Sequence, residues 1–142
     1  MLSYARACGM HVAAAVAEAL PFADASFDYV PIVTTFCFVD DAHAMLREAH
    51  RVLRMDGDVV IGLIDLESPI RQHHLAHQAK DVFCLEARFY SAVEVDALLG
   101  DAGFADLIWL QILSVPLSQI REMESLATGT DHGAFLVVHG RA

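Results

Sequence analysis

The sequence predicts an α/β domain built on a largely parallel sheet, and three observations support that prediction. The 142 residues suit one domain with a core of its own. Hydrophobic residues make up 56% of the chain and the mean hydropathy is +0.43, as expected where helices cover both faces of a parallel sheet. Short apolar runs alternate with helix-like segments, the pattern of strands joined by crossover helices. A surface covered by another polypeptide would also raise the hydropathy, so both interpretations stay open.

The first quarter of the chain is predicted to contain short elements. Residues 2–7 have the pattern of the end of a helix, which Gly9 stops. A β-like run over 11–16 then leads into the turn-rich segment 17–28. An apolar strand is expected over 29–33.

The middle of the chain alternates between helix and strand. Asp40 or Asp41 can cap a helix over 41–54, whose apolar side chains recur at helical spacing. Residues 55–58 are predicted to form a turn, in which Gly57 is available for a left-handed conformation. The apolar, β-branched run 59–64 predicts a buried strand. A further helix is expected over 68–80, with a proline in its first turn.

The last third is predicted to hold one helix and two strands. Ser91 and Glu94 stand in capping-box register and Gly103 marks the end, which together predict a helix over 91–102. Strands are expected over 105–114 and 133–140. The predicted order is therefore β-β-α-β-α-α-β-β, with a strand pair at its end.

Charge narrows the class of partner. The formal net charge is −10, from 19 acidic against 9 basic residues. A negative field of this size repels polyphosphate, so we expect no nucleic-acid partner. A small-molecule substrate or a protein side chain is the better expectation.

Targeting signals and cysteine usage favour a cytoplasmic protein without a membrane span. The longest uncharged apolar stretch, 107–117, is well short of the roughly 20 residues that a membrane helix needs. The first ten residues lack the apolar core of a secretory signal. Cys8, Cys37 and Cys84 are odd in number and widely spaced, which suits reduced thiols better than a disulfide framework or a zinc site.

Three strings of the sequence resemble one enzyme family. AEALPFADASFDYV (17–30) resembles the AExLPFxDxSFDxV stretch of type 11 methyltransferases. DDAHAMLREAHRVLRMDGDVVIG (40–62) is similar to their DpxxaLxExxRVLrPGGxlxIg segment, and ARFYSAVEVDALLGDAGF (87–104) to frfyTpeELxxLLxxAGF. The strings occur in the family's order and spacing and cover most of the chain. The sequence thus resembles the C-terminal part of a class I S-adenosylmethionine-dependent methyltransferase.

The resemblance implies a Rossmann-like sheet of order 3-2-1-4-5-7-6, with an antiparallel last strand. No GxGxG occurs in the chain, and Gly9 is the only glycine before Gly57. We therefore expect residues 1–142 to be a single domain that begins after the first two strands and the glycine-rich cofactor loop. The strand over 29–33 would then be an exposed edge through which copies could self-associate, although Pro31 weakens such an edge.

The resemblance also implies where the cofactor, S-adenosylmethionine, would bind. Ligands of open α/β sheets lie outside the carboxyl ends of the strands, at a switch in strand order. Ala17 and Glu18 follow one predicted strand, and Val33 and Thr34 end the next, so these four are the expected cofactor contacts. Without the glycine-rich loop and the ribose-binding acid, we expect weak or absent binding.

Acceptor contacts are expected beside this site. Phe36 and Phe38 would lie on the substrate side, with core packing as the open alternative. His73 and His77 are spaced to share one helix face over the pocket. They could act on the substrate, but no glutamate completes an HExxH pattern, so we expect no bound metal. The catalytic residues are not identified by the sequence.

Two functions follow from this pattern. The first is in-line transfer of a methyl group to a small-molecule acceptor, with this truncated chain inactive alone. The second is a non-catalytic, methyltransferase-like remnant that serves as a binding or dimerisation module.

Overall fold

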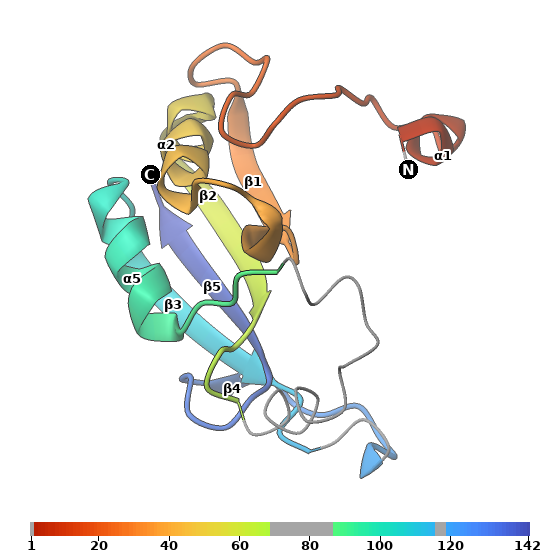
Figure 1. The fold of residues 1–142 in the computed structure, drawn as a ribbon, viewed down its shortest axis with the longest axis vertical. Coiled ribbons are helices and arrows are strands. Elements are labelled where there is room, and N and C mark those ends of the chain that lie inside the picture. The colour runs from red at the N-terminus through yellow and green to blue at the C-terminus, as the bar shows by residue number, and fades with distance from the viewer. Residues whose placement is uncertain (1, 69–86, 116–118) are drawn as a thin grey trace.

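The computed structural model describes residues 2–68, 87–115 and 119–142. One mixed sheet runs through these residues, with helices packed on it (Figure 1). The elements in chain order are α1 (Leu2–Ala7), β1 (Phe27–Val33), the 3-10 helix η1 (Phe36–Phe38), α2 (Ala42–Val52), β2 (Leu53–Ile64), α5 (Ala92–Asp101), β3 (Ala105–Ile112), β4 (Ala127–Thr128) and β5 (Phe135–Arg141).

The sheet confirms the predicted fold class. Its order is β1-β2-β5-β3-β4, with β1 parallel to β2 and β5 antiparallel to both of its neighbours. The series β1-β2-β5-β3 corresponds to the 4-5-7-6 half of the expected order. The last strand is antiparallel, as predicted, and the strands expected over 59–64, 105–114 and 133–140 all belong to this one sheet.

Helix α2 covers β2 with one apolar face, as its periodicity predicts. The carboxylate of Asp41 caps the helix by accepting from the backbone N–H of Ala44 at 2.9 Å. Its buried side chains are Ala42, Met45, Leu46, Ala49 and Val52. The helix was predicted to reach residue 54, but Leu53 already has extended backbone angles and begins β2. No loop therefore separates the helix from the strand.

The predicted turn over 55–58 is wrong, because these residues lie within β2. The left-handed residue is Asp56, with φ 64°, and not Gly57. Gly57 is needed for space instead: a β-carbon there would lie 2.9 Å from the carbonyl oxygen of Arg54 and 3.2 Å from that of Asp28.

Helix α5 packs beside α2 and begins as predicted. Ser91 accepts from the backbone N–H of Glu94, and the Glu94 carboxylate accepts from the backbone N–H of Ser91 at 2.8 Å, so the capping box is complete. Gly103 follows the helix with φ 99°. Fully buried side chains from α2, α5 and the sheet form the core, among them Leu46, Val59, Ile61, Val95, Leu99, Leu136 and Val138.

One predicted strand is not formed, one short strand was not predicted, and one predicted helix cannot be judged. The strand expected over 11–16 is not formed; its one β-type contact is an isolated bridge between Val16 and Ala19, since no described strand lies beside it. The two-residue strand β4 was not predicted. The helix expected over 68–80 lies almost entirely outside the described residues.

The second face of the sheet is apolar and is not covered by a described helix. Strand alternation places Tyr29, Val33, Ile64 and Ile108 on this face, and their exposed fractions are 68%, 56%, 43% and 54%. Exposed apolar side chains thus gather on this face within the described part of the chain. No helix in the described part of the chain is long and apolar enough to cross a membrane.

Candidate functional site

The carboxyl ends of the parallel strands β1 and β2 form one rim of the sheet. The chain turns sharply where β1 ends: Thr34 has φ 52°, and its backbone N–H donates to the carbonyl oxygen of Gly62 in β2 at 2.8 Å. Parallel strands bring their carboxyl ends to the same edge, which is where α/β folds bind ligands. The two predicted cofactor residues Val33 and Thr34 lie at this rim.

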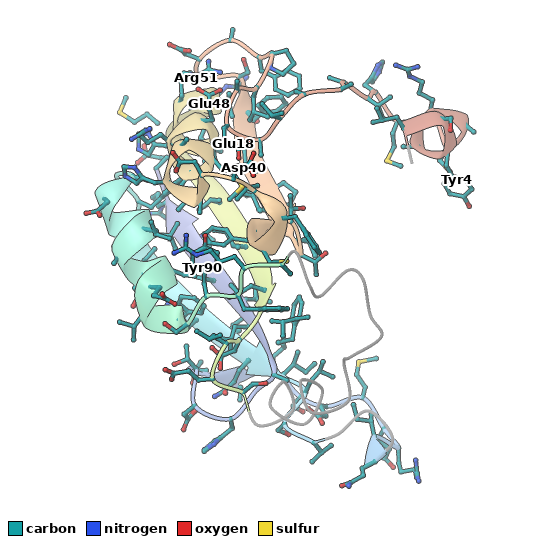
Figure 2. The ribbon with its side chains drawn as sticks, in the orientation of Figure 1. Tyr4, Glu18, Asp40, Glu48, Arg51 and Tyr90 are labelled. Carbon is teal, nitrogen blue, oxygen red and sulfur yellow. The ribbon has the colours of Figure 1, made fainter. Side chains whose placement is uncertain are left out.

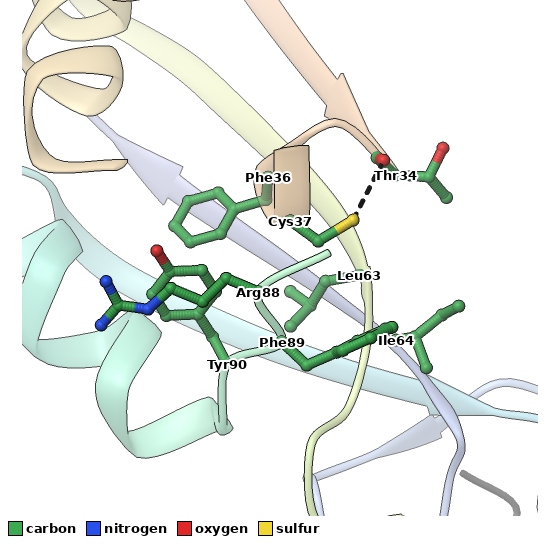
Figure 3. A pocket seen from close by; sticks show the side chains of 8 residues that line it. All are labelled: Thr34, Phe36, Cys37, Leu63, Ile64, Arg88, Phe89 and Tyr90. Carbon is green, nitrogen blue, oxygen red and sulfur yellow. Dashed lines mark hydrogen bonds between the residues drawn. The ribbon is translucent and has the colours of Figure 1, made fainter. Parts of the chain in front are cut away.

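A small apolar pocket of about 20 Å³ opens at the rim (Figure 3). Its lining comes from the turn after β1, the end of β2 and the segment before α5, and consists of Thr34, Phe36, Cys37, Leu63, Ile64, Arg88, Phe89 and Tyr90. We call it the rim pocket. The structure therefore brings the predicted cofactor residue Thr34 together with the predicted substrate residue Phe36.

Aromatic side chains shape the rim pocket. Phe36 and Tyr90 meet edge to face, with ring centroids 4.9 Å apart, and both are buried. The guanidinium of Arg88 lies over the Tyr90 ring, 4.9 Å from its centroid. The Cys37 thiol donates to the carbonyl oxygen of Thr34 at 3.6 Å. Phe36 belongs to the core, as the packing interpretation holds, and it also lines the pocket; its contact with an acceptor stays a prediction.

Phe38 is placed differently from Phe36. Its side chain is 54% exposed and does not line the rim pocket. The 3-10 turn of η1 separates the two rings, sending Phe36 inward and Phe38 outward. His73 and His77 lie outside the described residues. Within the described part, no three His, Cys, Asp or Glu side chains come together as a metal site.

Ala17 and Glu18 lie on the other side of β1. Ala17 lines an open apolar groove with residues of β1 and α2, among them Val30 and Met45. The Glu18 carboxylate accepts from the backbone N–H groups of Asp40 and Asp41, at 2.9 and 3.2 Å. Backbone N–H groups, first its own and then that of Asp41, hold the pKa of Glu18 below its usual value. The two predicted cofactor pairs thus flank β1 without lining one common pocket.

A second, polar pocket lies beyond the end of β2 and was missed at the sequence level. It is lined by Asp65, Glu67, Ser68, Ser91, Ala92, Val93, Thr130, Asp131, His132 and Gly133. A parallel bridge between Asp65 and Tyr90 separates it from the rim pocket. The buried Gln111 was the available signal, because a lone amide in the apolar run 105–112 needs polar partners.

Comparison with known proteins identifies the family. A family model described as a methyltransferase domain matches residues 1–61. The crystal structure of an S-adenosylmethionine-dependent methyltransferase from Thermotoga maritima, described as a possible histamine N-methyltransferase, is 38% identical in sequence. It superposes with a TM-score of 0.93 over 99% of this chain and 68% of that chain. The chain belongs to the class I S-adenosylmethionine-dependent methyltransferases.

Two uncharacterised relatives show how much of a methyltransferase this chain represents. A protein of Methanocaldococcus jannaschii is 31% identical over 138 residues, which cover 97% of this chain and 67% of the relative. A protein of Mycobacterium tuberculosis is 36% identical over 138 residues, which cover 96% of this chain and 48% of the relative. The chain thus spans about two thirds of the length of the first relative and about half of the length of the second.

S-adenosylmethionine is the cofactor of this family, and the residues present fit it only in part. Ala17 and the Val33–Thr34 turn offer small and backbone groups on either side of β1. The carboxylate of Glu18 already accepts two backbone N–H groups, and the sequence holds no GxGxG loop. The described residues at this rim therefore offer no glycine-rich loop and no unengaged Glu18 carboxylate for such a cofactor.

Proposed function

We propose that the whole protein transfers a methyl group from S-adenosylmethionine to a small-molecule acceptor, and that this chain supplies the acceptor side of the site. The observation that carries the proposal is the rim pocket. In a member of the methyltransferase family, an aromatic cavity opens at the carboxyl ends of two parallel strands. Ligands of open α/β sheets bind at this edge.

The residues of the proposed site divide by their position around β1. Ala17 and Glu18 would stand on the adenine side, and Val33 and Thr34 beside the methionine end. Phe36 would contact the acceptor from within the rim pocket, and the exposed Phe38 would contact a part of the acceptor that lies outside it. The histidines His73 and His77 are proposed as further acceptor contacts, although they lie outside the described residues.

The proposed methyl transfer requires little chemistry from these residues themselves. When bound, the cofactor supplies a methyl group activated by a sulfonium, so direct displacement needs no covalent enzyme intermediate. The protein's part is to hold the acceptor in line and to exclude water. The aromatic and aliphatic lining of the rim pocket suits that part, and the cation among its described lining residues, Arg88, is engaged over the Tyr90 ring. These features support an acceptor whose inserted portion is apolar and uncharged.

Cofactor binding by the 142-residue chain alone should be weak or absent. Hydrogen bonds to charged groups contribute about 1.5–3 kcal/mol each. Losing two or three of them, at a tenfold change per ~1.4 kcal/mol, raises the Kd by several orders of magnitude.

Calorimetry with S-adenosylmethionine tests this on two forms of the protein: the 142-residue chain, and the same chain extended upstream by a segment that carries a glycine-rich loop. We expect binding by the extended form only. A micromolar Kd for the chain alone would contradict the assignment of the cofactor site, and no binding by either form would contradict the methyltransferase proposal.

One observation favours a second candidate, a binding or dimerisation module. Thr34 directs its backbone N–H to β2, so by alternation the backbone groups of Tyr29, Pro31 and Val33 point away from the sheet. No described strand pairs with this edge. Pro31 removes one donor from its centre, which weakens edge-to-edge pairing. Sedimentation at rising concentration separates the candidates: a dimer that a Val33→Lys change dissociates supports the module.

A further inference from the structure

Hydrogen bonds join the loop of residues 17–26 to α2, or to the residues just before it, at both ends of the loop; Glu18, Glu48 and Arg51 are labelled in Figure 2. Its first end is held by Glu18, whose Oε1 accepts from the backbone N–H of Asp40 and of Asp41, just before the helix. Its far end is held by main-chain bonds, in which Ala25 and Ser26 donate their backbone N–H groups to carbonyl oxygens at the end of α2, at 3.0 and 2.8 Å.

Arg51 of α2 holds the middle of the loop. Its guanidinium donates to the carbonyl oxygen of Leu20 at 3.2 Å and to that of Phe22 at 2.9 Å. It also donates to the Asp24 carboxylate at 2.6 Å. One planar group therefore joins three separate positions of the loop, a geometry that the lysine ammonium cannot reproduce.

Glu48, one turn earlier on α2, fixes the guanidinium in place. Its two carboxylate oxygens accept from Nε and NH2 of Arg51, both at 2.8 Å, a bidentate pairing. The same carboxylate accepts from the backbone N–H of Leu20 at 2.8 Å. The two side chains are partly buried, with exposed fractions of 20% and 32%. Glu48 and Arg51 thus act together on one loop residue, Leu20.

We propose that Glu18 and Arg51 are positioning residues that fix Ala17 at the cofactor rim. This rests on the proposed function, because that function makes the rim a cofactor site. The carboxylate of Glu18 is directed at the start of α2, so Glu18 serves the site through its main chain and not as a charged ligand. Ala17 is the preceding residue and cannot shift without breaking that contact. Helix α2 packs on β2 as part of the core. A loop that is bonded to α2 is therefore held against a rigid part of the protein.

Amide hydrogen exchange on the 142-residue chain tests the positioning directly. Arg51→Lys should raise exchange at Leu20, Ala25 and Ser26 by about tenfold, the loss of one or more charge-assisted hydrogen bonds. Arg47→Lys is the matched control on the same helix, because the Arg47 guanidinium contacts His43 and not the loop. Equal exchange in the two variants would overturn the role of Arg51.

Two substitutions at Glu18 separate positioning from direct ligation. Glu18→Ala should raise exchange at Asp40 and Asp41, and at Ala19 in the turn that holds Ala17, whereas Glu18→Gln keeps an acceptor oxygen and should restore most of the protection. Glu122→Ala, which removes an exposed carboxylate elsewhere, controls for charge. Unchanged exchange in Glu18→Ala would overturn the proposal.

Calorimetry on the upstream-extended form tests whether this positioning affects cofactor binding. Glu18→Gln should bind S-adenosylmethionine nearly as well as the parent, and Glu18→Ala should bind it more weakly. If Glu18→Gln lost binding while its exchange stayed protected, Glu18 would be a direct ligand and the proposal would be wrong. Failure of the extended parent to bind would contradict the proposed function instead, and the exchange data would still decide the positioning role.

Discussion

The backbone N–H of Gly133 donates to Oε1 of Gln111 at 2.7 Å, and a β-carbon on Gly133 would lie 2.7 Å from the Cβ of that same glutamine. Gln111 is 5% exposed and uses both ends of its amide. Its oxygen also accepts from His132, and its nitrogen donates to Thr128 and Asp131. One buried amide therefore organises the segment 128–133, which lines the polar pocket.

Gly133→Ala should destabilise the fold by about 1–3 kcal/mol, the usual cost of forcing extra volume into a packed site. The new methyl group would also meet the backbone of Ile112, at 2.8 Å from its oxygen. Gly100→Ala is the control, because Gly100 lies in α5 with no atom near its Cβ position. That change should stabilise by about 0.5–1 kcal/mol. Urea unfolding measures the change in unfolding free energy for both variants. Two changes of the same sign would contradict the packing argument.

Gln111→Met should cost about 1–3 kcal/mol, because it keeps the volume but leaves the buried N–H group of Gly133 and the partly buried N–H group of His132 without their acceptor. Gln119→Met, at an exposed position, should be close to neutral. Unfolding free energies would show the contrast. Equal stability of the two variants would mean that water satisfies the segment as well as the amide does.

Ser91→Ala should destabilise α5 by about 1 kcal/mol, since the N-cap hydroxyl accepts from the backbone N–H of Glu94. Ser91→Thr keeps the oxygen and should recover most of the loss. Ser125→Ala, at an exposed position outside any helix, is the matched control. Thermal unfolding followed by circular dichroism ranks the three. A Ser91→Thr variant as weak as Ser91→Ala would point to packing and not to the cap.

Lowering the pH should weaken the contacts between α2 and the loop of residues 17–26 within a defined range. Hydrogen bonds from Arg51, and then from the backbone of Leu20, lower the pKa of Glu48 from 4.5 to about 2. A lowered pKa in the folded state means that this carboxylate stabilises the fold fully above pH 4.5 and loses that effect as the pH falls toward 2. The stability difference between the parent and Glu48→Gln should therefore shrink across this range. A difference that stayed constant down to pH 2 would contradict it.

Features encoded by neighbouring residues were predictable from the sequence. The capping box of Ser91 and Glu94, the cap at Asp41 and the end at Gly103 each join residues a few positions apart, and all three are found as expected. The strands β2 and β5 were also predictable, because buried strands consist of nearly continuous apolar runs.

Features that depend on distant residues were not predictable. The run 11–16 has the composition of a strand, but a strand exists only beside a partner, and no described strand is available there. The Glu18 carboxylate accepts from backbone groups 22 and 23 residues further along the chain, which no local pattern indicates. The same holds for Arg51, since its place in the last turn of α2 indicates only a basic residue favoured near a helix end.

The direct passage from Val52 in α2 to Leu53 in β2 leaves any adjustment of strand register to the residues that follow. The step from Phe27 to Tyr29 in β1 is matched by the step from Leu53 to Asp58 in β2, so the pairing is irregular there. Residues 59–64 of β2 pair regularly with both β1 and β5, and one residue inserted among them would turn every following side chain to the opposite face. Length variation among homologues should therefore be excluded at 59–64 and tolerated in the exposed segment 13–15, where no strand register depends on it.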